Sequence, residues 1–356
     1  MKRLLLVTIF ITSVASNLFA QDRREILREL QKFGNFIGYI NQVYVDTLNN
    51  RLMIEDAIRG VLSQLDPHST YITAEDMKQV EEDFNGNFEG IGVEYSMTND
   101  TIIVINTISG GPSAKVGILP NDKIVKINGN NAVGLKLRDV PKYLRGPKGS
   151  VVNLGIIRNG VSDLLEFKIV RDKIPIYTFD ATYKVNDNTG YIRINRFSTT
   201  TNDEMKDALN KLSGIKNLIV DLRGNGGGLL NQAILISSQF INPGKIIVST
   251  EGKNMPNKSF TSVAEGKFRN GGLCIIVDET SASASEIVAG AIQDWDRGII
   301  IGRPTFGKGL VQQQIPLPDG SAVRITTARY HTPSGRVIQR PFEKGKRHKY
   351  QFFLRY

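Results

Sequence analysis

Three serines lie where a short apolar run gives way to a helical pattern, and one of them could act as a nucleophile. They are Ser281, Ser283 and Ser285, between a predicted strand at 273–277 and a predicted helix at 283–295. The start of a helix leaves about four backbone N–H groups without internal partners. Those groups favour negative charge and can stabilise an oxyanion beside an attacking serine.

The same serines also fit a structural role. Ser283-Ala-Ser-Glu286 matches a capping box, in which Ser283 only caps the helix. A nucleophilic serine needs a base, and no histidine of the chain stands in a triad motif, the three being His68, His331 and His348. Lys308, flanked by two glycines, is the candidate base, because burial can lower a lysine pKa to about 7–8. Considered alone, such a lysine is more typical of a solvated loop.

Two longer motifs surround these residues: Ser-Ala-Ser-Ala-Ser-Glu at 281–286, and Gly-Arg-Pro-Thr-Phe-Gly-Lys-Gly-Leu-Val-Gln at 302–312. Both resemble motifs of the carboxyl-terminal processing (tail-specific) serine peptidases. In that family the middle serine is the nucleophile, a later lysine is the base, and a glutamine beyond it orients the lysine. Ser283, Lys308 and Gln312 match this pattern, with the family's spacings of 25 and four positions. The resemblance therefore implies a Ser-Lys dyad supported by Gln312.

A glycine-rich segment at 221–228 lies between a predicted strand and a predicted helix. Its spacing does not match a dinucleotide-binding fingerprint, because Leu229 stands where the third glycine is needed. The family resemblance instead implies an oxyanion hole, formed by the backbone N–H groups of Gly228 and Ala284. Gly227 is the alternative to Gly228 if the register differs by one residue.

The sequence also argues against nucleotide and metal chemistry. Residues 302–308 match a phosphate-loop pattern, but Gly309 stands where a Ser or Thr is needed, and the next segment reads as extended rather than helical. There is no His-Glu-x-x-His motif, and Cys274 is the single cysteine, inside an apolar run that indicates core packing. We predict neither a cofactor nor a metal.

Residues 87–172 read as a separate β-rich domain. Strands are predicted at 102–105 and 123–127, with Gly-Pro-Ser-Ala and Leu-Pro-Asn-Asp turns around them. With the preceding Gly-Ile-Gly-Val, these segments resemble a PDZ domain, which adds a peptide to a sheet edge and holds its terminal carboxylate with backbone N–H groups. The resemblance implies a peptide-binding carboxylate loop made of Gly90, Ile91, Gly92 and Val93. Glycines that simply form a turn would also explain this segment.

Arg145 begins the segment Arg-Gly-Pro-Lys-Gly-Ser late in the same region. The segment resembles one that carries a regulatory arginine in some family members. The resemblance implies that Arg145 links peptide binding to the catalytic site by supporting Gln312. The alternative is that Arg145 is a solvated turn residue.

The remainder of the chain reads as helices followed by alternating strands and helices. Helices are predicted upstream at 26–50 and 53–65. From residue 190 onward, predicted strands (191–197, 217–222, 246–249, 273–277, 299–301) alternate with predicted helices (202–212, 229–241, 283–295). Such alternation indicates a buried sheet covered by helices. The predicted fold class is therefore multidomain, α+β and α/β, with an N-terminal helical region, a PDZ-like β-rich domain and an α/β peptidase domain.

The N-terminus resembles a secretory signal peptide, with Met1-Lys2-Arg3 followed by an apolar run that reaches Ala20. A retained membrane anchor is the alternative. We predict export to the periplasm or cell envelope. The expected parts are a signal peptide at 1–20, an N-terminal helical region at 21–86, the PDZ-like domain at 87–172, the peptidase domain at 173–340 and a basic tail at 341–356.

Composition is that of a globular protein, with 40% hydrophobic and 22% charged residues. The net charge of +10 is scattered apart from the C-terminal tail and shows no basic patch interleaved with aromatics, so we predict no nucleic-acid partner. We predict a serine endopeptidase that recognises the carboxyl termini of proteins or peptides and cleaves envelope proteins. Envelope association and homo-oligomer formation stay open. The alternative is a non-catalytic PDZ scaffold or inactive homologue, which would lack Ser283 or Lys308, whereas both are present.

Overall fold

The computed structural model describes residues 24–263 and 266–342, so the predicted signal peptide and most of the basic tail lie outside the described residues. The chain divides between Val61 and Leu62 into two compact units. In the first, residues 24–43 are helical and a second helix, α2 (Asn50–Ser63), begins. No helix among the described residues is both long enough and apolar enough to span a membrane.

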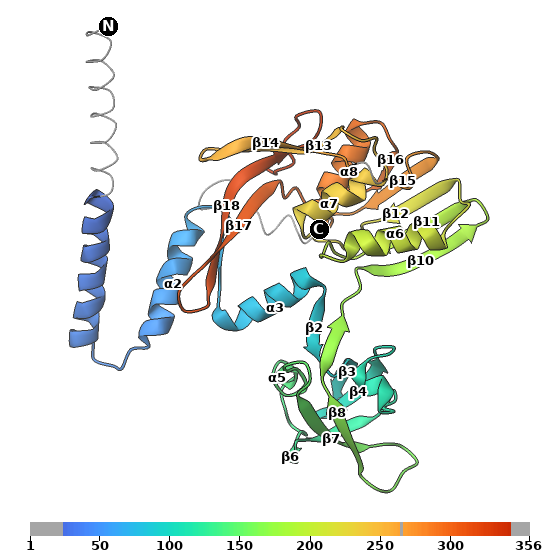
Figure 1. The fold of residues 1–356 in the computed structure, drawn as a ribbon. Helices are drawn as coiled ribbons and strands as arrows, with labels where there is room; N and C mark the ends of the chain where they lie inside the picture. The colour runs from blue at the N-terminus through green and yellow to red at the C-terminus, as the bar shows by residue number, and fades with distance from the viewer. Residues whose placement is uncertain (1–23, 264–265, 343–356) are drawn as a thin grey trace. The chain divides into compact units, whose positions relative to one another are not determined.

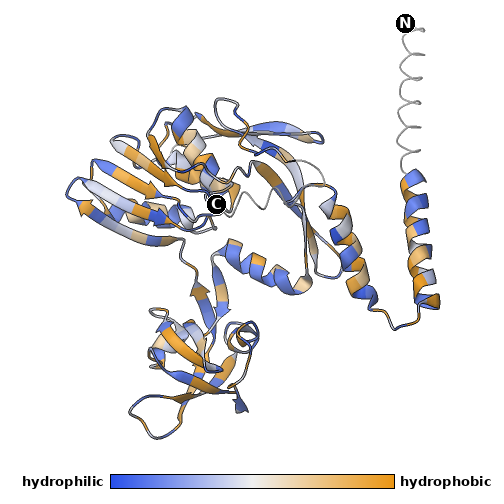
Figure 2. Ribbon diagram, turned by 180° about the vertical axis from the view of Figure 1, so that it is seen from behind, coloured by the Kyte–Doolittle hydropathy of each residue, from blue (hydrophilic) through white to orange (hydrophobic). Residues whose placement is uncertain are grey.

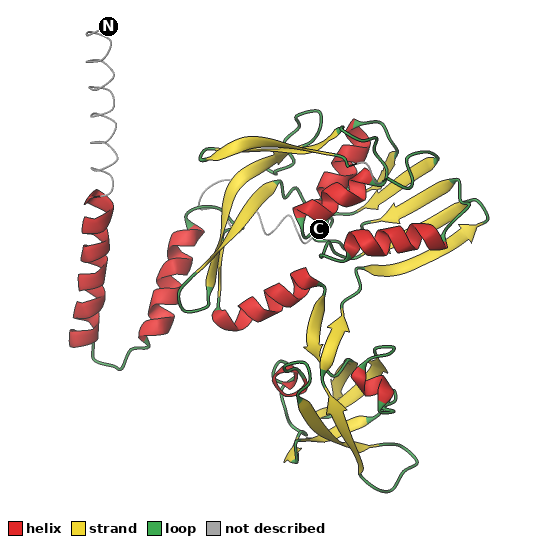
Figure 3. Ribbon diagram, viewed as in Figure 1, coloured by secondary structure: helices red, strands yellow, loops and turns green. Residues whose placement is uncertain are grey.

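The predicted β-rich domain is present in the second unit (Figure 1, Figure 3). Its sheet has the order β3-β4-β5-β7-β8, with β6 pairing β5, and two short helices, α4 (Pro112–Lys115) and α5 (Val140–Leu144). The strands are β3 (Val93–Thr98), β4 (Thr101–Thr107), β5 (Lys123–Ile127), β6 (Asn130–Asn131), β7 (Val151–Ile157) and β8 (Leu165–Val170). Buried aliphatic side chains such as Ile102, Val104 and Ile156 form its own core. An independent core marks it as a domain.

Short elements precede and follow this domain. A turn at 64–69 leads into β1 (Thr70–Ile72) and α3 (Ala74–Asn85), which the side chain of Thr73 caps. An antiparallel ladder of β2 (Asn87–Gly90) and β9 (Asp172–Pro175) then joins the chain entering the domain to the chain leaving it.

A second sheet has the order β10-β11-β12-β15-β16 and carries the predicted α/β pattern. Only β10 (Phe179–Asn186) is antiparallel to its neighbour, whereas β11 (Thr189–Ile194), β12 (Asn217–Asp221), β15 (Gly272–Val277) and β16 (Ile299–Gly302) are parallel. Helices α6 (Thr201–Lys211), α7 (Leu230–Ser238) and α8 (Ala284–Asp294) pack with it around the largest core. In Figure 2 these strands carry orange segments beside paler and blue ones, and every second residue of β11 and β15 is buried, so one face of the sheet packs on the core.

A third sheet was not predicted as a unit. It has the order β1-β18-β13-β14, with β17 also paired to β18. Its strands are β1, β13 (Ile246–Gly252), β14 (Met255–Thr261), β17 (Leu310–Pro316) and β18 (Ala322–His331). The predicted extended segment after Lys308 is confirmed as β17. Because β1 pairs with β18, the chain before the β-rich domain is joined to the hairpin that follows the Lys308 loop.

Candidate active site

The candidate residues meet at one edge of the parallel sheet. β12, β15 and β16 lie side by side and are followed by the loops at 222–229, 278–283 and 303–309. Because parallel strands end at the same edge, their following loops converge, and this is where ligands bind in open α/β sheets. The glycine-rich loop, the serine motif and the lysine motif are therefore neighbours although they are far apart in sequence.

Ser283 differs from the two serines beside it. Ser281 is buried, and its hydroxyl donates to the carbonyl of Leu222 at 2.8 Å. Ser285 is also buried, and its hydroxyl donates to the carbonyl of Asn225 at 2.9 Å. Ser283 is half-buried and is the N-cap residue of α8, with φ of 53°, a left-handed conformation that is uncommon outside glycine. Of the three serines, Ser283 is the one placed to meet a ligand.

The glycine-rich loop packs directly against Ser283. A Cβ added to Gly227 would lie 2.8 Å from the Cβ of Ser283, so only glycine permits this approach. The N–H of Gly227 is already used, because it donates to the Asn225 side chain at 2.8 Å. Among the described residues, the N–H groups of Gly228 and Ala284 have no acceptor. Ala284 follows Ser283 directly, and Gly228 follows the glycine that contacts Ser283, so both donors belong to the segments that meet at this serine.

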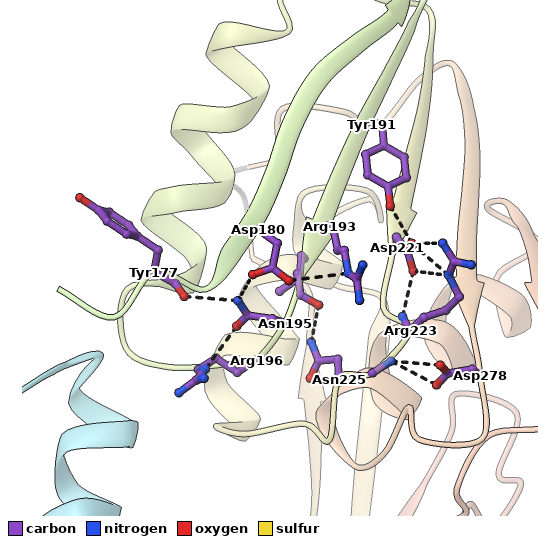
Figure 4. A network of polar contacts seen from close by, with 12 residues as sticks. Tyr177, Asp180, Tyr191, Arg193, Asn195, Arg196, Asp221, Arg223, Asn225 and Asp278 are labelled. Carbon is purple, nitrogen blue, oxygen red and sulfur yellow. Dashed lines mark hydrogen bonds and ion pairs between the residues drawn. The ribbon is translucent and has the colours of Figure 1, made fainter. Parts of the chain in front are cut away.

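A network of polar contacts braces the same loop (Figure 4). Asp221 is fully buried and accepts hydrogen bonds from the Tyr191 hydroxyl at 2.7 Å and from Arg223. The hydrogen bonds from Arg223 and Tyr191 outweigh the opposing effect of burial and hold the pKa of Asp221 below its usual range. The residue after Arg223 is Gly224, and its N–H donates to both carboxylate oxygens of Asp278. The turn before Ser283 is thus tied to the glycine-rich loop.

Glu286 is a site residue whose role the sequence did not indicate beyond the capping box. Glu286 is a buried residue of α8, with an exposed fraction of 4%. One carboxylate oxygen accepts from the backbone N–H groups of Ser283 and Lys308, each at 2.8 Å. The other accepts from the N–H of Gly307 at 2.6 Å and the hydroxyl of Thr305 at 2.7 Å. A single carboxylate therefore joins the serine turn to the lysine loop.

Lys308 is held in a partly buried position between the two glycines. Burial lowers the pKa of its ammonium below the usual range, and the positive charge of Arg324 lowers it further, while the carboxylates of Asp66 and Glu286 oppose both effects. A lysine in this environment carries a larger neutral fraction near neutral pH than an exposed lysine does.

Gln312 lies four residues beyond Lys308, on β17. Its Nε2 donates to the carbonyl oxygen of His68 at 2.7 Å. Within the described residues, its Oε1 has no hydrogen-bond donor. The structure does not place Gln312 within hydrogen-bond distance of Lys308.

A cavity of about 480 Å³ opens beside the start of β17. It is lined on one side by the turn at 66–68 and on the other by Leu310, Gln339 and Arg340. In the part of the chain that the structure covers, no group of three or more His, Cys, Asp or Glu side chains is arranged to hold a metal ion.

The predicted carboxylate loop of the β-rich domain also has free donors. Gly90, Ile91 and Gly92 are buried, and the N–H groups of Ile91 and Gly92 have no acceptor among the described residues. Val93 begins β3, which is the edge strand of its sheet and has one side unpaired. An unpaired edge next to free N–H groups is the arrangement that accepts an extended peptide and its terminal carboxylate.

Arg145 lies next to this loop but contacts α3 rather than Gln312. Its Cα is 3.6 Å from the position that a Cβ on Gly90 would occupy. Its guanidinium pairs with the carboxylate of Glu82, donates to Gln79 at 2.8 Å, and lies 4.6 Å from the centre of the Phe88 ring. The solvated-turn interpretation of Arg145 does not describe these contacts.

Comparisons with known proteins agree with this architecture. The profile of peptidase family S41 matches residues 188–344, and that of the PDZ domain matches residues 90–169. A carboxy-terminal-processing protease of Bartonella bacilliformis is 38% identical over 92% of this chain and 76% of its own length. The carboxy-terminal processing protease CtpA of Bacillus subtilis is 36% identical over 94% of this chain and 72% of its own length. A putative S41 protease from Bacteroides fragilis shares the fold, with a TM-score of 0.50, 16% identity, and coverage of 88% of this chain and 91% of that one.

Replacing Glu286 by Gln should uncouple the serine turn from the lysine loop. Both carboxylate oxygens of Glu286 accept hydrogen bonds from backbone N–H groups. The amide of Gln replaces one of these oxygens by an NH₂ group, which cannot accept, so at least one backbone N–H loses its partner. We expect peptide hydrolysis to fall by about 100-fold, the scale of a misplaced catalytic group, as measured by kcat with a fluorogenic peptide. Glu279→Gln is the matched control, because Glu279 forms only an exposed ion pair with Arg303. Equal kcat in the two variants would contradict the role of Glu286.

Proposed function

This chain belongs to the carboxy-terminal-processing serine peptidases of family S41 and has a PDZ domain, and from that premise we propose that Ser283 is its nucleophile and Lys308 its general base. One observation carries the proposal. Of the three serines in the motif, Ser283 alone is accessible, at a helix start and next to two free N–H groups, while Ser281 and Ser285 are buried and hydrogen-bonded to the backbone.

The reaction needs a neutral Lys308 amine. The amine takes the proton of the Ser283 hydroxyl while the serine oxygen attacks the carbonyl carbon of the scissile peptide. The N–H groups of Gly228 and Ala284 donate to the oxyanion that forms. Lys308 then gives the proton to the departing amine, and a water activated by the same lysine releases the acyl group from Ser283.

Gln312 is proposed to orient the base. Its Nε2 is fixed by the carbonyl of His68, which leaves Oε1 without a donor among the described residues. A neutral amine carries N–H donors and one lone pair, so Oε1 of Gln312 can accept from Lys308 while the lone pair faces Ser283. This contact is proposed for the substrate-bound state.

The PDZ domain is proposed to select substrates by their carboxyl termini. The free N–H groups of Ile91 and Gly92 support this, together with the unpaired edge of β3. Such a domain delivers proteins with accessible tails to the dyad, which makes the chain an endopeptidase that acts upstream of the recognised end.

The proposed site of action is the periplasm or cell envelope, with envelope proteins as substrates. The support is the basic start and apolar run at 1–20, which fit a signal peptide or a retained anchor. N-terminal sequencing of the protein from fractionated cells tests this. A soluble cytosolic protein that still begins at Met1 would contradict the proposal.

Ser283→Ala and Lys308→Ala should each abolish cleavage of a tail peptide while the protein stays folded. Because the two residues of a dyad act together, loss of either one removes nearly all of the rate enhancement of the dyad, about 10⁴-fold or more in kcat. Ser281→Ala is expected to retain more activity than Ser283→Ala, because the Ser281 hydroxyl bonds to the backbone. Steady-state kinetics and circular dichroism provide the two readouts. Wild-type turnover in Ser283→Ala would reject the assignment and favour a binding scaffold.

Arg145 is proposed to couple peptide binding to catalysis. It lies next to Gly90 in the carboxylate loop and, without peptide, pairs with Glu82 of α3. We propose that, in the peptide-bound protein, Arg145 leaves Glu82 and supports Gln312 without itself contacting the bound carboxylate. Arg145→Ala should therefore lower kcat by about 10-fold or more, the coupling range of allosteric sites, with the Kd of the tail peptide unchanged in the Ser283→Ala background. Unchanged turnover would leave Arg145 as a brace between α3 and the PDZ domain.

A further inference from the structure

The turn at 66–69 lies outside both profile matches, yet it contacts the lysine loop on both sides of Lys308. The His68 ring packs edge-on against Phe306, two residues before the lysine, with ring centres 6.2 Å apart. The His68 carbonyl accepts from Gln312, four residues after it. The turn thus contacts the chain immediately before and after the proposed base.

A carboxylate shapes this turn. Oδ1 of Asp66 accepts from the N–H groups of His68 at 2.7 Å and Ser69 at 2.9 Å, and Oδ2 accepts from the Ser69 hydroxyl at 2.6 Å. Ser69 is buried, and its oxygen also accepts from the N–H of Thr326 on β18 at 3.3 Å. The hydrogen bonds fix the direction of the His68 carbonyl and dock the turn on the strand paired with Gln312.

Asp66 also contributes charge. The charged groups that act on Lys308 come from three elements: Asp66 from the turn, Glu286 from α8 and Arg324 from β18. The two carboxylate oxygens of Glu286 already accept four hydrogen bonds. Asp66 belongs to a separate segment, which lines the cavity beside β17. The carboxylate of Asp66 opposes the lowering of the Lys308 pKa by burial and by Arg324.

We propose that the turn Asp66–Ser69 is a positioning element of the catalytic base: Asp66 sets the His68 carbonyl that holds Gln312, and it places a carboxylate in the turn that packs on the lysine loop. The proposal rests on the proposed function of Lys308. It makes Asp66 a positioning residue, supplied by a part of the chain that precedes the PDZ domain.

The chain offers a matched control for Asp66. Asp319 forms the same kind of turn at the far end of the β17–β18 hairpin, where Oδ1 accepts from the N–H and hydroxyl of the buried Ser321. Asp319 is not among the groups whose charge acts on Lys308. Asp319→Asn therefore removes a turn carboxylate from the same hairpin without changing the field at the base.

The experiment measures kcat/KM for one tail peptide against pH in the wild type, Asp66→Asn and Asp319→Asn. The rising limb reports the pKa of the free enzyme's base, and rate rises with pH because only the neutral amine accepts the proton. Asp66→Asn keeps an oxygen for the turn but removes the charge that raises the Lys308 pKa, so the limb should move to lower pH. Asp319→Asn should leave it in place. If the rising limb of the Asp66→Asn profile coincides with that of the wild type, the proposed effect of the Asp66 charge on Lys308 is wrong.

Asp66→Ala tests the geometric part, because it removes the turn's acceptors as well. We expect kcat at the optimum to fall by about 10- to 100-fold, with tail-peptide Kd unchanged in the Ser283→Ala background. If the Asp66 variants unfold at the assay temperature, Ser69→Ala is used in their place. This variant keeps the Asp66 carboxylate, so kcat should fall while the rising limb of the pH profile stays in place. Wild-type kcat in either variant overturns the positioning role.

These outcomes are distinct from a failure of the proposed function. If Lys308→Ala retains turnover, the assignment of the base fails, whatever the Asp66 variants do. If Lys308→Ala is inactive while the Asp66 variants match the wild type, the dyad stands and only the role of the turn fails.

Discussion

The buried carboxylate of Glu286 is the interaction on which the site depends. It is an uncompensated charge unless its donors are present, and those donors come from two loops that follow different strands. Displacing the Lys308 loop would leave that charge unpaired next to Ser283. The same carboxylate accepts from the N–H of Ser283, whose positive-φ conformation, rarely adopted by non-glycine residues, costs roughly 1–3 kcal/mol. Capping and nucleophilic roles for Ser283 are therefore compatible, because Glu286 secures the cap geometry.

The environment of Lys308 is a balance of opposed effects. Burial and Arg324 favour the neutral amine, while Asp66 and Glu286 favour the ammonium. A base is most effective when its pKa lies near the working pH, so neither extreme would serve. Arg324 is itself fixed, since its guanidinium donates to Gln314 at 3.1 Å and lies 5.8 Å from the Phe84 ring centre. The groups that set the balance are therefore held by hydrogen bonds within the fold, Asp66 in its turn, Glu286 in α8 and Arg324 on β18.

Local pattern predicted much of this fold, whereas the candidate dyad was identified from the resemblance of its motifs to a known peptidase family. The apolar run at 273–277 and the helix after Ser283 were recognisable because their periodicity is local. Three features were not recognisable. β1 has only three residues, too few for a pattern, and its pairing with β18 depends on contacts over 250 residues apart in sequence. Glu286 read only as a capping-box residue, since its donors at 305–308 lie in another loop. For Arg145 the sequence left two alternatives open, support of Gln312 or a solvated turn, and its pairing with Glu82 was not recognisable because the two residues are 63 positions apart.

Helix α3 gives the PDZ domain and the peptidase site a shared physical element. Near its end, Glu82 holds Arg145 beside the carboxylate loop, and two residues later the ring of Phe84 meets Arg324, whose charge acts on Lys308. The helix end is also fixed to the peptidase domain, because the carbonyl of Phe84 accepts from the N–H of Thr199 at 3.0 Å. Glu82 and Phe84 are therefore held in place relative to each other by one turn of a capped helix. Arg145 lowers the pKa of the buried Glu82 carboxylate, which burial raises, so loss of this pairing would let Glu82 take up a proton more readily.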